Sequence, residues 1–171
     1  MRCFVALWPA AATRAALASV TTGLVASHPA ARPMRPANLH LTLAFIGELD
    51  APMATAVAAA LDKIAVQPFV WQIDRLGHFA HPRVVWAGGP PAPLLEALAQ
   101  TVREQLDQLR VDYDLKRFAA HVSLLRNAPR LLAPSELEPI AWPASRPQLI
   151  VSSRDDAGAL VYRPWPSLPQ H

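Results

Sequence analysis

The sequence contains a single cysteine, Cys3, among its 171 residues. A lone cysteine cannot form a disulfide within the chain, and it cannot supply the sulfur ligands of a cysteine zinc site. The sequence therefore excludes a disulfide-stapled secreted domain, and we expect the protein to work in a reducing cytoplasm.

Long apolar runs are also missing. The longest stretch without a charged side chain, residues 15–31, contains serine, threonine and histidine and is short for a membrane span. Near the amino terminus, the apolar residues 3–8 are followed by Pro9 and then Arg14, which argues against a secretory signal. We expect no membrane segment.

Lysine is rare, because 14 of the 16 positively charged side chains are arginine. The planar fork of arginine suits phosphate oxygens, although a biased genome composition would produce the same excess. The net charge is only +3. A charge this small favours a short footprint over a few phosphates rather than a long track along a duplex.

Signatures of several other chemistries are absent. Gly88 and Gly89 are followed by prolines instead of the helix start and Lys-Ser/Thr of a phosphate-binding loop. Asp112 and Asp114, like the pair at residues 155–156, are interpreted as solvated turn acids and not as paired catalytic carboxylates.

His78 and His81 lie in a segment that we predict to be a loop between two strands. Their spacing could bind zinc if a third ligand came from elsewhere, but no cysteine pair or acidic cluster accompanies them. Two exposed loop histidines explain the pattern equally well. We therefore expect neither a metal nor another cofactor.

The spacing of apolar residues predicts alternating strands and helices, and hence an α+β fold in a single domain over residues 1–171. Strands are predicted at residues 1–7, 38–46, 69–76, 83–87, 119–125, 148–153 and 159–163, the last two forming a hairpin. Helices are predicted around residues 17–24, at 52–66 and at 95–109. The proline-rich residues 28–36 and 127–147 are predicted to be a loop and an irregular segment.

The most informative feature is an internal repeat. Residues 38–45 (NLHLTLAF) and 119–126 (AAHVSLLR) share the order histidine, apolar, hydroxyl, apolar, and their histidines are 81 residues apart, close to half the chain. Alternate residues of a strand lie on one face about 7 Å apart. Each copy therefore aims one imidazole and one hydroxyl to the same side and its leucines or valine into the core.

Such polar groups on apolar strands cost free energy unless they line a cleft or find partners. If an approximate two-fold axis relates the halves, His40 and His121 face each other across one groove. One imidazole can then take a proton from an entering water while the other protonates a leaving oxygen, which suits in-line displacement at phosphorus. The hydroxyls of Thr42 and Ser123 would donate to the non-bridging oxygens.

These motifs resemble those of the 2H phosphoesterases and, within them, the bacterial RNA 2′,3′-cyclic phosphodiesterases, also described as 2′-5′ RNA ligases. The likeness covers residues 2–7, 38–48, 83–88, 118–126 and 152–162. It implies two similar lobes, each an antiparallel sheet backed by helices, around a central cleft. Separately, we expect the protein to be a monomer. It also implies metal-independent hydrolysis of 2′,3′-cyclic phosphates on RNA ends or nucleotides to 2′-phosphomonoesters, with weak reverse 2′-5′ joining of RNA.

The resemblance also implies a role for each motif residue. His40 is the proton donor to the departing ribose 3′ oxygen, and His121 is the proton acceptor that activates water. Thr42, Ser123 and Arg126 hold the phosphate.

Arg126 and Phe45 each follow their histidine by five residues, an odd offset that a regular strand sends to the opposite face. Either the second strand ends near Leu125 and the chain turns, which brings Arg126 to the site, or Arg126 serves the surface. The family resemblance favours the first alternative. Phe45 could stack on a base, although an aromatic residue on an apolar strand more often belongs to the core.

Two other functions fit the same residues. A non-catalytic module that binds RNA ends or nucleotides would keep the cleft without turnover, and a phosphodiesterase for a small cyclic phosphate would use the same histidines. The presence of both His40 and His121 favours catalysis, since a binding module could replace either with a better hydrogen-bonding group.

Overall fold

The computed structural model describes residues 1–166. Its strand pairs are antiparallel, and the predicted α+β class is confirmed. The elements in chain order are β1 (Arg2–Leu7), α1 (Ala11–Val25), β2 (Arg32–Pro33), the 3-10 turn η1 (Pro36–Asn38), β3 (Leu41–Glu48), α2 (Ala51–Asp62), β4 (Val70–Phe79), β5 (Val84–Gly88), α3 (Pro93–Gln108), β6 (Val122–Arg126), β7 (Glu136–Pro143), β8 (Gln148–Arg154) and β9 (Leu160–Pro164).

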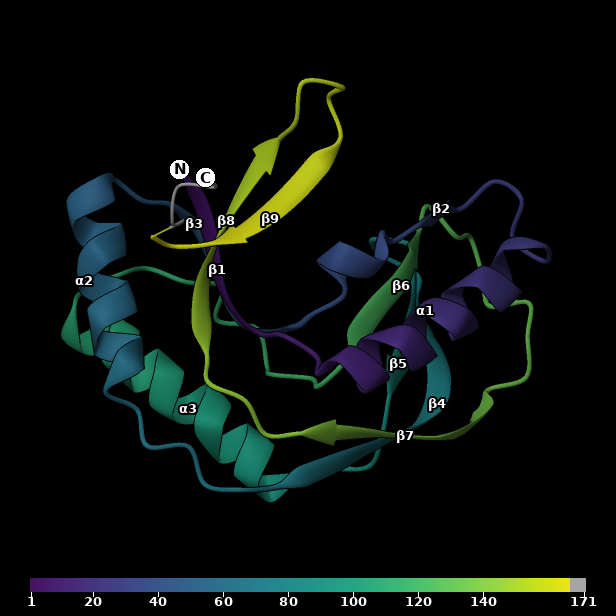
Figure 1. The fold of residues 1–171 in the computed structure, drawn as a ribbon, viewed down its shortest axis with the longest axis horizontal. Helices are drawn as coiled ribbons and strands as arrows, with labels where there is room; N and C mark the ends of the chain where they lie inside the picture. The colour runs from purple at the N-terminus through teal and green to yellow at the C-terminus, as the bar shows by residue number, and fades with distance from the viewer. Residues whose placement is uncertain (167–171) are drawn as a thin grey trace.

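The strands form one path in the order β7-β4-β5-β6-β3-β1-β8-β9, with β2 attached to β6. Strands β6 and β3 are joined by a single residue pair, Leu41 with Val122. The other neighbouring strands of this path share more pairs. Four strands of the path lie on each side of that join. The two halves correspond to the expected lobes, and α2 and α3 pack at one end of the molecule while α1 packs at the other (Figure 1).

The helices bury the faces that their apolar spacing predicts. On α3, the side chains of Leu95, Val102 and Leu106 are completely buried, and each buried leucine or valine stabilises the fold by about 1.5–3 kcal/mol. Helix α2 ends at Asp62, four residues before its predicted end. None of the helices among the described residues is long and apolar enough to cross a membrane.

The prediction that residues 127–147 are irregular is wrong, because residues Glu136–Pro143 form β7. This strand lies at the edge of the sheet. Proline cannot donate to a hydrogen-bond ladder, but an edge strand is paired on only one side and tolerates it. In the predicted loop at residues 28–36, Arg32–Pro33 likewise pair with β6 as a short strand.

Strand β4 continues three residues beyond its predicted end at Leu76. His78 therefore lies on a strand, not in a loop, and its Nε2 atom is 2.8 Å from the backbone carbonyl oxygen of Ala128. Gly77 beside it has no side chain, and a Cβ atom there would overlap the ring of Trp86. The absence of a side chain at Gly77 therefore leaves the space that the Trp86 ring occupies.

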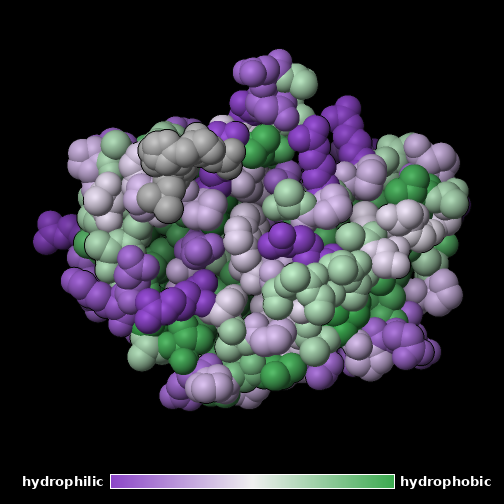
Figure 2. Space-filling model, viewed as in Figure 1, coloured by the Kyte–Doolittle hydropathy of each residue, from purple (hydrophilic) through white to green (hydrophobic). Residues whose placement is uncertain are grey.

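The predicted hairpin of β8 and β9 is confirmed, and it projects from the sheet (Figure 1). Its turn is closed by Asp155, whose carboxylate accepts a hydrogen bond from the backbone N–H of Ala159 at 2.8 Å. Gly158 has a φ angle of 75°, which glycine adopts without strain. Figure 2 shows strongly hydrophilic side chains gathered around the projecting end of this hairpin.

Candidate active site

The pairing of β3 with β6 determines how the two sequence motifs meet. In an antiparallel pair, a local two-fold axis passes between the opposed residues, here Leu41 and Val122. That axis exchanges residues 81 apart, so it exchanges His40 with His121. Because Leu41 and Val122 are completely buried, the motif residues on either side of them point to the opposite face of the sheet.

A β-bulge in each motif strand brings Phe45 and Arg126 to the same face. The pairing of β3 with β1 skips Leu43, and the pairing of β6 with β5 skips Leu124. One extra residue reverses the alternation of side chains along a strand. Arg126 therefore reaches the site because of a bulge, while β6 continues past Leu125, and Phe45 is 38% exposed instead of belonging to the core.

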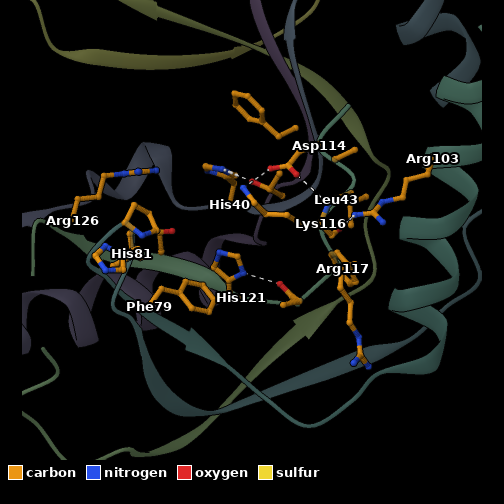
Figure 3. A pocket seen from close by; sticks show the side chains of 18 residues that line it. His40, Leu43, Phe79, His81, Arg103, Asp114, Lys116, Arg117, His121 and Arg126 are labelled. Atoms are coloured by element: carbon orange, nitrogen blue, oxygen red, sulfur yellow. Dashed lines mark hydrogen bonds and ion pairs between the residues drawn. The ribbon is translucent and has the colours of Figure 1, made fainter. Parts of the chain in front are cut away.

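This face of the sheet lines a cleft of about 540 Å³. The imidazoles of His40 and His121 are directed toward the same space, with Arg126 and His81 at one side (Figure 3). All six side chains predicted from the sequence line the cleft: His40, Thr42, Phe45, His121, Ser123 and Arg126. The structure thus brings together every predicted site residue.

His40 is packed among aromatic rings. Its ring centroid lies 4.9 Å from that of Phe4 and 5.1 Å from that of Tyr162. Loss of hydration in this pocket lowers the pKa of His40 from 6.5 to about 4, and a hydrogen bond to a backbone carbonyl partly opposes the shift. The positive charge of Arg126 lowers the pKa further, as does that of His121 when it is protonated.

His121 has a similar environment in the other half of the sheet. Its ring lies edge-on to Phe79, with centroids 5.0 Å apart, and 6.4 Å from Trp86. Burial lowers the pKa of His121, the hydrogen bond with the carbonyl of Ala119 raises it, and the charge of Arg126 lowers it. Both histidines are therefore expected to be neutral in the free protein near pH 7.

Both imidazoles are held in the same tautomer. The Nδ1 atoms of His40 and His121 each lie 2.7 Å from a backbone carbonyl oxygen, that of Asn38 and that of Ala119. Because a carbonyl can only accept, each Nδ1 carries the proton. Each Nε2 atom can then accept a proton or, once protonated, donate one, and that of His40 lies 3.1 Å from the Thr42 hydroxyl.

The wall of the cleft nearest α3 is positively charged. None of its basic side chains is among the site residues predicted from the sequence. Arg103 of α3 and Lys116 and Arg117 of the loop before β6 line this wall (Figure 3). Asp114, predicted to be a turn acid, lines it too and forms an exposed ion pair with Lys116 at 3.0 Å. These residues follow no regular spacing in the sequence, so their gathering depends on the fold.

The structure separates His78 from His81. His81 lines the cleft, whereas His78 is bonded to the backbone of Ala128. Within residues 1–166, no group of three or more histidine, cysteine, aspartate or glutamate side chains is placed to hold a metal ion. The expectation that the site needs no metal stays a prediction.

Known proteins resemble this chain in sequence. A family model described as LigT like phosphoesterase matches residues 7–86. The RNA 2′,3′-cyclic phosphodiesterase of Escherichia coli strain K12 is 37% identical over 101 residues, which are 58% of this chain and 57% of that protein. The protein of the same name from Archaeoglobus fulgidus is 35% identical over 98 residues, 56% of this chain and 55% of its own length. The matched part thus spans little more than half of these relatives.

The structural likeness extends over nearly the whole chain. The crystal structure of E. coli LigT complexed with 3′-AMP has a TM-score of 0.83 and 30% sequence identity, and the match covers 99% of this chain and 98% of that chain. A match of this extent includes both histidine motifs, whereas the family model reaches only the first. The chain therefore belongs to the LigT-like phosphoesterases, the 2H family that its two motifs resemble.

Proposed function

We propose that this chain is an RNA 2′,3′-cyclic phosphodiesterase that opens the cyclic phosphate at an RNA 3′ end and leaves a 2′-phosphomonoester. One observation carries the proposal: two imidazoles in the same tautomer, one from each half of the sheet, line a single cleft. This is the arrangement that paired acid and base catalysis at phosphorus requires. The names of the E. coli and A. fulgidus relatives support the same activity.

In the proposed reaction, the Nε2 atom of His121 takes a proton from water while the water oxygen attacks phosphorus. The bond between phosphorus and the ribose 3′ oxygen breaks, and the Nε2–H of His40 protonates that oxygen. The products are a 3′ hydroxyl and a 2′ phosphate. The two-fold axis makes the positions of the two histidines nearly equivalent, so their geometry does not distinguish donor from acceptor. The assignment of His40 as donor and His121 as acceptor comes from the family resemblance.

The other predicted site residues would hold the substrate. The hydroxyls of Thr42 and Ser123 donate to the non-bridging oxygens, and the guanidinium of Arg126 offsets the charge that develops on them. A phosphodiester carries one negative charge, so these three groups provide the stabilisation in our proposal. The exposed ring of Phe45, at the edge of the cleft, offers a surface on which a base can stack.

We propose that one unit over residues 1–171 makes the complete site as a monomer, because both imidazoles come from a single polypeptide. The lone cysteine, Cys3, is buried in the main core. We propose a cytoplasmic location on a different ground, because a chain with one cysteine forms no internal disulfide that would need an oxidising compartment.

The identity of the product tests the proposal. Protein incubated with an RNA oligonucleotide that ends in a 2′,3′-cyclic phosphate is expected to yield only the 2′ phosphate, which ³¹P NMR distinguishes from the 3′ isomer. A 3′ phosphate would reverse the roles of the histidines, and tight binding without a product would identify a binding module.

A metal chelator such as EDTA is expected to leave the rate of hydrolysis unchanged, because the proposed reaction uses only side chains of the protein. Loss of activity in the presence of the chelator would reveal a metal-assisted reaction.

The pH dependence of kcat/KM provides a second test. It is expected to be bell-shaped with an optimum below pH 6.5, since one imidazole must be protonated while the other is neutral and both have lowered pKa values. Above the higher pKa the acid loses its proton, and kcat/KM should fall about tenfold per pH unit. The bound phosphate favours the imidazolium, so the kcat profile should lie at higher pH. An optimum of kcat/KM above pH 7 would contradict this model.

A further inference from the structure

A second cavity, of about 440 Å³, adjoins the cleft. The two cavities share the side chains of His40, Thr42, Phe45 and Arg126. The second cavity contains neither His121 nor Ser123, so it opens from the His40 side of the cleft alone. A ligand held between the histidines can therefore extend past His40 into this space.

Three neighbouring strands, β1, β8 and β9, form the part of the second cavity that the cleft does not share. Arg2 of β1 is paired with Ser152 of β8, which is paired with Tyr162 of β9, so their side chains form a row across the sheet. Arg154 follows Ser152 by two residues and lies on the same face. All four side chains line the cavity. This face of β1 is opposite the face that packs into the main core through Cys3 and its alternate neighbours.

The lining of the cavity carries positive charge from Arg2, Arg126 and Arg154 and includes no acidic side chain. Within the described part of the chain, no carboxylate is within ion-pair distance of these three guanidinium groups. Glu48, which is paired with Arg2 across the strands, instead contacts the N-terminal amine at 2.9 Å. The guanidinium of Arg154 donates to the carbonyl of Gly158 and keeps its other N–H groups for a ligand.

Aromatic contacts hold the arginine cavity close to the histidine site. The guanidinium of Arg2 lies 5.1 Å from the centre of the Phe45 ring, a cation–π contact at the boundary of the two cavities. Tyr162 contacts His40 with ring centroids 5.1 Å apart. An anion bound by Arg2 and Arg154 would therefore lie beside a phosphate bound at His40 rather than at a remote surface.

We propose that the arginine cavity binds the phosphodiester that precedes the terminal nucleotide of an RNA strand, while the terminal cyclic phosphate lies between the two histidines. This inference rests on the proposed function, in which His40 protonates the ribose 3′ oxygen. The terminal ribose then lies on the His40 side, and its 5′ oxygen carries the next phosphate toward Arg2 and Arg154. A phosphate at that position distinguishes an RNA end from a nucleoside cyclic phosphate.

Three substrates and four proteins test the inference. The substrates are adenosine 2′,3′-cyclic phosphate, its 5′-phosphorylated form, and a dinucleotide ending in the same cyclic phosphate. The proteins are the wild type, Arg2→Gln, Arg154→Gln and the control Arg163→Gln. Arg163 is exposed on β9, where alternation places it on the face opposite Tyr162. Thermal unfolding of each variant verifies that it is folded.

For the wild type, kcat/KM for both substrates with a 5′ phosphate is expected to exceed that for adenosine 2′,3′-cyclic phosphate by about tenfold, the effect of one charge-assisted contact. This ratio should fall to about twofold or less in Arg2→Gln and Arg154→Gln and stay at the wild-type value in Arg163→Gln. The salt dependence of kcat/KM should be steeper for the dinucleotide than for adenosine 2′,3′-cyclic phosphate, and this difference should shrink in Arg2→Gln and Arg154→Gln.

The inference fails if the wild type shows no preference for a 5′ phosphate, or if Arg2→Gln and Arg154→Gln both keep the wild-type preference. These outcomes differ from failure of the proposed function. In that case, the wild type would hydrolyse none of the three substrates, and the inference would fall with the function on which it rests.

Discussion

Replacing either His40 or His121 with alanine is expected to lower kcat/KM for an RNA 2′,3′-cyclic phosphate by about 100-fold or more, the typical contribution of one positioned acid or base. Each imidazole carries one of the two proton transfers of a single step. Removing both should therefore cost less than the product of the two separate losses. Initial rates with the cyclic-phosphate oligonucleotide, measured for the two single variants and the double variant, test both statements.

His81 provides the matched control because it is a third imidazole that lines the same cleft. It comes from the turn after β4 and not from a motif strand. We expect His81→Ala to reduce kcat/KM less than tenfold. A larger loss for His81→Ala than for His40→Ala or His121→Ala would move the chemistry to that side of the cleft and contradict the proposed mechanism.

The second large effect is expected at Arg126, whose replacement with glutamine should lower kcat by about 100-fold, as removal of a group that stabilises developing charge does in other enzymes. Arg126→Lys should restore only part of the rate, because lysine keeps the charge but loses the planar fork. Steady-state kinetics of both variants measure the two effects.

The pH profile separates this role of Arg126 from a purely structural one. The charge of Arg126 lowers the pKa of both His40 and His121. Without it, both pKa values rise, so the bell of kcat/KM should move to higher pH in Arg126→Gln. The control is Arg32→Gln, since Arg32 is paired with Arg126 across β2 and β6 but does not line the cleft. A normal rate and an unshifted profile in Arg126→Gln would contradict the assignment.

Local sequence patterns predict much of the fold and the centre of the site. Alternation along a strand is a property of neighbouring residues, so the sequence indicates that His40 and Thr42 share one face, as do His121 and Ser123. The helical spacing of α3 likewise predicts its buried residues. The two-fold relation of the motifs follows from their repetition, and the pairing of Leu41 with Val122 agrees with it.

The prolines of β7 show where local patterns mislead. Proline is unfavourable in a paired strand, and the composition of residues 127–147 therefore predicts no strand. The position of β7 at the sheet edge removes the conflict, but that position depends on pairing with β4, more than sixty residues earlier in the chain. A sequence window cannot contain this information.

By itself, the sequence determined the alternating elements, the repeated motif and the four motif side chains that share one face. Only the tertiary structure decided that bulges at Leu43 and Leu124 return Phe45 and Arg126 to that face, and that Arg2 and Arg154 lie beside His40 in one cavity. The physical reason is that periodicity arises from backbone geometry between neighbours. A β-bulge, by contrast, depends on how a strand pairs with its neighbour in the sheet. The arginines come together for the same reason, because their strands are far apart in the chain and meet only when the sheet forms.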